Sequence, residues 1–149
     1  MAAPVSDLDI LVLEDDPLVR LSLLETLAHA GYRAIGTGNG LEGLARLAEG
    51  SPRLILMDMV MPGMDGYEFL ARLRANSEWS QIPVVIISSL GYALQESVDH
   101  RGRDTLGIFG IVPKPIDTAT LLELVGLMLG VDGSEPQEPE PGAPPPDRE

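Results

Sequence analysis

The chain has 149 residues, no cysteine and a net charge of −13. This length predicts one domain of ordinary size, and the lack of cysteine excludes disulfides, thiolate nucleophiles and sulfur-ligated metals. The acidic surface would repel phosphate backbones, so we expect no direct binding of nucleic acid. No apolar run reaches the roughly 18–20 residues of a membrane span, and residues 1–10 do not resemble a signal peptide. We therefore expect a cytoplasmic protein.

The first part of the chain predicts two strand–helix units. The apolar run Ile10–Leu13 predicts a strand, and the next helix follows with Asp16 as its N-cap and Pro17 at its first position. Residues 33–36 predict a weaker strand, and residues 39–48 predict a second helix. We assign to the apolar faces of the two helices Leu18, Leu21, Leu24, Leu27 and Ala28, and then Leu41, Leu44, Ala45 and Ala48.

The alternation continues after residue 50. Leu54–Asp58 is a short apolar run followed by Pro and Gly turn residues, a pattern typical of a strand buried on both faces. Two further strands are predicted at residues 83–88 and within 107–113. Helices are predicted over residues 65–75, 91–98 and 117–129, with a loop over 100–106.

Five strands alternating with helices predict an α/β fold with a doubly wound parallel sheet. We place this domain at residues 8–130, after a flexible N-terminus at residues 1–7. Residues 131–149 hold six prolines and six acidic residues, so this tail is predicted to be disordered.

Polar residues follow the four strong strands. In a parallel sheet the carboxyl ends of all strands lie at one edge, where open α/β sheets bind ligands. The residues placed there are Glu14, Asp15 and Asp16, then Asp58, then Ser88 and Ser89, and finally Lys114. Lys114 is the only lysine among ten basic residues, which favours a compact point charge at this position. Taken alone, Asp58 could be a nucleophile, a metal ligand or a loop cap.

Together, these residues indicate which cation and which reaction the site could support. Carboxylates packed together need either a raised pKa or a cation. Oxygen ligands without cysteine favour a hard ion, and Mg²⁺ suits a few carboxylates with water and phosphate oxygens. A carboxylate beside Mg²⁺, a lysine and a hydroxyl is equipped to attack phosphorus and form an acyl phosphate.

Four motifs resemble the receiver domain of two-component response regulators. They read ILVLEDDP, LILMDMVMPGMDG, PVVIISS and the pair Lys114-Pro115, and they occur in the family's order. The resemblance covers about residues 8–129. It implies a flavodoxin-like sheet with the strand order 2-1-3-4-5, and a cis bond between Lys114 and Pro115.

The resemblance also implies a role for each site residue. Asp58 matches the phosphoacceptor, which takes a phosphoryl group from a histidine kinase or a histidine phosphotransfer protein. Lys114 matches the lysine that pairs with the phosphate, and Ser88 the hydroxyl that bonds it and shifts on activation. The implied Mg²⁺ ligands are Glu14, Asp15, Asp58 and the backbone carbonyl of Val60.

Three features depart from the family pattern. Glu14 is longer than the aspartate more usual at its position, and the stretch from Ser88 to Lys114 is a few residues longer than usual. Ile111 stands where the fifth strand usually carries an aromatic switch residue, three positions before the lysine. As a hypothesis, Phe109 supplies part of that role, because strand alternation puts it on the same face.

Two enzyme classes are excluded because the chain lacks the motif that each one needs. A phosphoaspartyl hydrolase needs an aspartate two residues after the nucleophile, where this chain has Val60, and a P-loop NTPase needs a glycine-rich loop that is absent. The remaining alternative is a degenerate receiver that serves as a constitutive docking module. We expect a non-enzymatic switch that signals by contact with a downstream protein, with a homodimer through the last helices as a further expectation.

Overall fold

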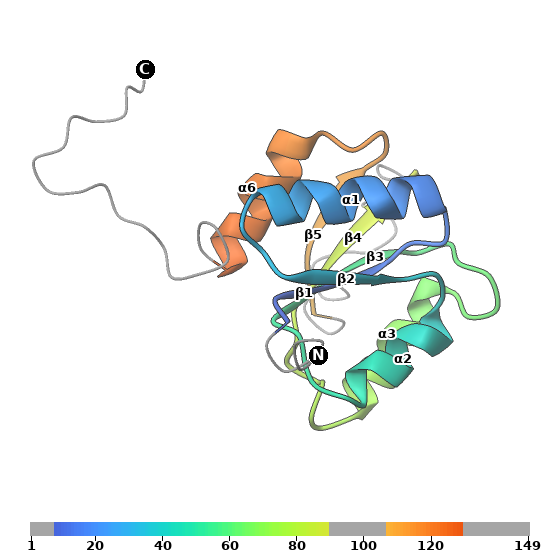
Figure 1. Cartoon of the computed structure of the whole chain (residues 1–149). Helices are drawn as coiled ribbons and strands as arrows, with labels where there is room; N and C mark the ends of the chain where they lie inside the picture. Colours follow the sequence, from blue (N-terminus) through green and yellow to red (C-terminus); the bar gives the residue numbers. More distant parts are fainter. Residues whose placement is uncertain (1–7, 90–106, 130–149) are drawn as a thin grey trace, which may run out of the picture.

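The computed structural model describes residues 8–89 and 107–129. Five parallel strands form one sheet in the order β2-β1-β3-β4-β5, as expected for a doubly wound fold (Figure 1). The strands are β1 (Ile10–Leu13), β2 (Ala34–Thr37), β3 (Leu54–Asp58), β4 (Val84–Ser88) and β5 (Ile108–Pro113). The helices are α1 (Pro17–His29), α2 (Gly40–Leu47), α3 (Gly66–Ala75) and α6 (Thr118–Leu129).

Helices cover both faces of the sheet. Helices α1 and α6 lie on one face, and α2 and α3 lie on the other (Figure 1). Each face has its own apolar cluster: Leu23, Leu27, Leu121 and Val125 belong to the first, and Leu47, Phe69 and Leu73 to the second. Strands β1, β3 and β4 are buried along their whole length, which explains their uninterrupted apolar sequences.

The ends of the helices follow their capping residues. Asp16 caps α1 by accepting hydrogen bonds from the backbone N–H groups of Leu18 and Val19, and Pro17 occupies the first turn. Asn39 caps α2 and Asp65 caps α3 in the same way. The predicted helix at 91–98 and the loop at 100–106 lie outside the described residues, as do residues 1–7 and 131–149.

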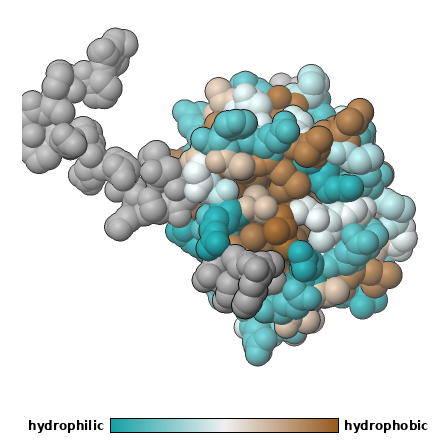
Figure 2. Space-filling view, in the orientation of Figure 1, coloured by the Kyte–Doolittle hydropathy of each residue, from teal (hydrophilic) through white to brown (hydrophobic). Residues whose placement is uncertain are grey.

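The predicted apolar faces of α1 and α2 need correction. Leu18 and Leu21 are 77% and 53% exposed, while Leu23 and Leu27 are buried. Helix α1 is apolar on more than one side, so the spacing of leucines did not identify its inner face. The space-filling view shows the resulting apolar surface along α1 and the edge strand β2 (Figure 2). In α2, Leu41 is 65% exposed, and the buried positions are Gly40, Gly43 and Leu47.

A bulge interrupts the pairing of β4 with β5. Val84 pairs with Ile108 but Val85 pairs with Gly110, so Phe109 is an extra residue in β5. Simple alternation therefore does not apply between Phe109 and Ile111. Phe109 is 40% exposed and Ile111 is 9% exposed. The role suggested for Phe109 stays a prediction.

Candidate functional site

The register of the sheet brings the predicted site residues to one edge. Leu13 pairs with Met57, so Glu14 and Asp58 leave their strands at the same level. Ser88 pairs with Pro113, and the backbone N–H of Lys114 donates to the carbonyl of Ser88 at 2.9 Å. The carboxyl ends of four neighbouring strands, β1, β3, β4 and β5, therefore present their polar residues at one edge of the sheet.

Lys114 is the cationic centre of the site. Its Nζ donates a hydrogen bond of 2.8 Å to Oδ2 of Asp58 and lies 2.9 Å from Oε1 of Glu14. Burial alone would lower the pKa of Lys114, but the contacts with Asp58 and Glu14 outweigh it and raise that pKa above its usual value. Lys114 is therefore a fixed positive charge at neutral pH.

Glu14 is fully buried. One of its oxygens, Oε2, accepts a hydrogen bond from the backbone N–H of Asp16, and the other, Oε1, has only the ion pair with Lys114, without hydrogen-bond geometry. Burial raises the pKa of Glu14, against the lowering effects of Lys114 and of the Asp16 N–H. Oε1 is thus a buried acceptor with capacity for a further cation.

Asp58 is held at both of its oxygens. Oδ1 accepts the backbone N–H of Val60 at 3.0 Å, and Oδ2 accepts the Lys114 ammonium. Asp58 is only 6% exposed, although it is the last residue of β3 at the carboxyl edge of the sheet. The sequence left Asp58 open as a nucleophile, a metal ligand or a loop cap. The hydrogen bond from the Val60 N–H makes it a loop cap, and its other oxygen still contacts the Lys114 ammonium.

Three carboxylates could hold a metal ion together. Glu14, Asp15 and Asp58 each offer an oxygen within 4.8 Å of the others, and Asp15 is the exposed member. The all-oxygen donor set of these three carboxylates fits a hard divalent cation such as Mg²⁺. The predicted contribution of the Val60 carbonyl stays a prediction, while its N–H is engaged with Asp58.

Ser88 and the peptide after Lys114 complete the site. Ser88 is fully buried at the end of β4, and the Lys114–Pro115 bond is cis, as the family resemblance implied. Asp16 and Asp65, which also lie near this edge, are occupied as helix caps.

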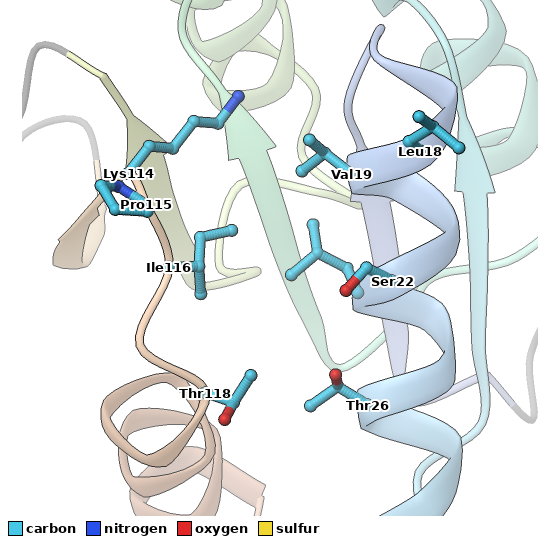
Figure 3. Close-up of a pocket in the computed structure, with 9 residues that line it drawn as sticks. Leu18, Val19, Ser22, Thr26, Lys114, Pro115, Ile116 and Thr118 are labelled. Carbon is cyan, nitrogen blue, oxygen red and sulfur yellow. The ribbon is translucent and has the colours of Figure 1, made fainter.

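An apolar cavity of about 320 Å³ opens beside Lys114. It lies between α1 and the segment that joins β5 to α6 (Figure 3). Val19 and Leu18 line it from α1, and Lys114, Pro115 and Ile116 line it from the other side. The sequence analysis did not identify this cavity, because it forms between segments about 90 residues apart.

Arg20 is a site neighbour that the sequence analysis also missed. Its Nη1 donates a 2.8 Å hydrogen bond to the backbone carbonyl of Glu14. Its only sequence signal is its position a few residues after Glu14, Asp15 and Asp16, which is not specific.

Within the described residues no helix is long and apolar enough to cross a membrane.

Comparisons with known proteins agree with this geometry. The family model of the response regulator receiver domain matches residues 10–126. The chain is 30% identical to Protein PilH of Pseudomonas aeruginosa over 120 residues, covering 80% of this chain and 96% of PilH. Three other curated relatives are longer, and the chain spans 48–54% of their length.

Solved structures of similar fold include two of particular relevance. The chemotaxis response regulator CheY4 of Vibrio cholerae has a TM-score of 0.71 at 25% identity, covering 82% of this chain and 98% of CheY4. The receiver domain of the sensor histidine kinase PA1611 of Pseudomonas aeruginosa has a TM-score of 0.68 at 25% identity, covering 81% of this chain and 96% of that one. The latter structure was determined with a magnesium ion coordinated in its active site cleft.

Proposed function

The chain belongs to the response regulator receiver domain family, and from this premise we propose that it is a switch that accepts a phosphoryl group from a histidine kinase on Asp58. The observation that carries the proposal is the hydrogen bond between Lys114 and Asp58 within a cluster of three carboxylates. Receiver domains are in general signalling modules rather than enzymes. The chemistry proposed here is limited to the protein's own modification.

In the transfer step, an oxygen of Asp58 forms a bond to phosphorus while the bond from phosphorus to the donor's histidine nitrogen breaks. The imidazole leaves with the electron pair of that bond. Negative charge on the phosphoryl oxygens lies near the ammonium of Lys114, which already contacts Asp58 at 2.8 Å. The hydroxyl of Ser88 is the proposed donor to a further phosphoryl oxygen.

Glu14, Asp15 and Asp58 are the proposed residues that hold Mg²⁺, together with the carbonyl of Val60. The ion supplies charge neutralisation for the phosphoryl group when it is bound. The magnesium in the related PA1611 receiver supports this assignment. Within the chain itself, the support is that Glu14, Asp15 and Asp58 each offer an oxygen within 4.8 Å of the others, with Asp15 exposed.

The apolar cavity beside Lys114 is the proposed docking surface for the phosphodonor. A kinase or phosphotransfer protein must bring its histidine to the carboxyl edge of the sheet, and this cavity is the adjacent apolar surface (Figure 3). Leu18, which lines the cavity and is 77% exposed, offers a contact for an apolar side chain.

Phosphorylation adds about −1.5 to −2 charges at this edge. Lys114 then has to leave Glu14 or share its ammonium with the phosphoryl group, and Ser88 has to turn towards the new oxygens. Both residues lie at the ends of β4 and β5, so the proposed output is a change in the surface near these strands that a downstream protein recognises.

The test is phosphorylation by acetyl phosphate with Mg²⁺, followed by intact-mass spectrometry. Wild type should gain one phosphoryl group, and Asp58→Asn should gain none. Asp65→Asn is the matched control, because Asn caps a helix as well as Asp does, and it should behave like wild type. No mass gain in wild type would support the degenerate docking module instead, and an unchanged gain in Asp58→Asn would refute the assignment of the nucleophile.

A further inference from the structure

Arg20 connects α1 to the acidic turn that follows β1. We infer that Arg20 is a positioning residue for the metal-binding carboxylates, acting through the backbone of Glu14. The inference rests on the proposed function, since it concerns the affinity of the same site for Mg²⁺. It assigns to Arg20 no contact with the ion or with the phosphoryl group.

The first observation is the hydrogen bond itself. Nη1 of Arg20 donates to the backbone carbonyl of Glu14 at 2.8 Å, a short distance for a charged donor. The same residue's backbone N–H donates to the carbonyl of Asp16 at 2.9 Å as part of α1. Arg20 therefore holds the turn on both sides of Asp15.

The second observation is the room made for this side chain. A Cβ atom built on Gly36 would lie 2.9 Å from Cγ of Arg20 and 3.0 Å from its Cδ. A Cβ on Gly38 would lie 3.2 Å from Nη1. The two glycines, Gly36 within β2 and Gly38 just after it, thus leave open the path along which Arg20 reaches the Glu14 carbonyl.

The turn needs such a restraint because its side chains repel one another. Glu14, Asp15 and Asp58 offer oxygens within 4.8 Å of each other, and Lys114 offsets their repulsion only where it contacts Glu14 and Asp58. The backbone N–H of Glu14 is bonded to the carbonyl of Thr37 at 3.1 Å, and its carbonyl is bonded to Arg20. With both backbone groups of Glu14 held, the turn keeps its carboxylates together before the ion arrives.

The direction of the effect separates this role from simple electrostatics. A positive charge near a cation site weakens cation binding, so removing Arg20 should tighten Mg²⁺ binding if charge alone matters. If Arg20 positions the turn, its removal should weaken binding. Loss of residues that orient metal ligands typically weakens affinity by about 10- to 100-fold, and we expect about tenfold for Arg20→Ala.

The experiment measures the dissociation constant of Mg²⁺ by isothermal titration calorimetry on the full chain. Gly36→Ala is the second variant, since it keeps Arg20 but obstructs its path. It should also weaken binding, and it should have little further effect in the Arg20→Ala background. Arg46→Ala is the control for loss of one positive charge, because Arg46 pairs with the exposed Glu49 and should leave the Mg²⁺ affinity unchanged.

The possible outcomes are distinguishable. Wild type that binds no Mg²⁺ would contradict the proposed metal site itself. Wild type that binds, with Arg20→Ala binding equally well or more tightly, would overturn only the role of Arg20. Additive effects of Arg20→Ala and Gly36→Ala in the double variant would also overturn it, because Gly36 would then act by another route. Thermal unfolding without metal shows that each variant is folded.

Discussion

Lys114→Met should destabilise the folded protein at pH 7, because it removes the cation between two buried carboxylates. Removal of one partner from a buried ion pair costs about 3–5 kcal/mol. The Lys114 side chain is 22% exposed, so water screens part of the interaction, and we expect about 2 kcal/mol. For a domain of this size, that loss lowers the melting temperature by roughly 5–10 °C. Differential scanning calorimetry in EDTA, which removes bound metal ions, measures this change in melting temperature.

The pH dependence of this variant has a defined sign. Burial raises the folded-state pKa of Glu14 above its ordinary value of 4.5, so the folded protein binds this proton more tightly than the unfolded chain does. The stabilising effect of that proton is present at low pH and is lost as pH rises through the raised pKa. Without Lys114 the pKa rises further, so Lys114→Met should gain more stability on acidification from pH 7 towards 4.5 than wild type.

A second substitution tests the cause. Glu14→Gln added to Lys114→Met removes one of the two carboxylate charges left without Lys114, so the double variant should be more stable at pH 7 than Lys114→Met. Arg46→Met breaks an exposed ion pair with Glu49 and should change stability by less than about 0.5 kcal/mol. The reasoning is refuted if Lys114→Met is as stable as wild type at pH 7. It is also refuted if the free energies of unfolding of wild type and Lys114→Met change by the same amount between pH 7 and 4.5.

Substitutions at three further positions test other parts of the structure. Mg²⁺ at millimolar concentration should raise the melting temperature of wild type but not of Asp15→Asn, and an equal rise in both would exclude Asp15 as a ligand. Asp16→Ala should cost about 1 kcal/mol in urea unfolding and Asp16→Asn much less, because a cap needs a side-chain acceptor; equal losses would contradict this. Arg74→Met should cost about 2 kcal/mol, because the partly buried guanidinium of Arg74 binds the carbonyls of Ser80 and Gly107, while Mg²⁺ affinity should not change. A change in affinity alone would show that Arg74 acts on the site instead.

The central strands were the most predictable part of the fold. Ile10–Leu13 and Leu54–Asp58 have the bounds that their apolar runs predicted. Strands buried on both faces need continuous apolar sequence, so each run ends where the strand leaves the core. The same physical rule predicted that Glu14, Asp58 and Lys114 come together, because the first polar residue after such a strand stands at the edge where ligands bind.

The helix faces and the bulge were less predictable. Helix α2 packs closely through Gly40 and Gly43, and a Cβ on Gly43 would lie 2.8 Å from Cδ2 of Leu13. Hydrophobic periodicity cannot register a contact made by residues without side chains. The extra residue Phe109 in β5 depends on how two strands pair, which neither strand's own sequence determines.

The single lysine of this chain also makes the site accessible to spectroscopy. Feeding ¹⁵N-labelled lysine during expression would label one residue, so its side-chain ammonium signal needs no assignment. In this structure that ammonium contacts both Asp58 and Glu14, and such contacts slow the exchange of ammonium protons with water relative to a free lysine. Metal binding and phosphorylation would each change the partners of the same nitrogen. One resonance could thus follow the state of the site in a mixture, or in cell extract, without any chemical probe attached to the protein.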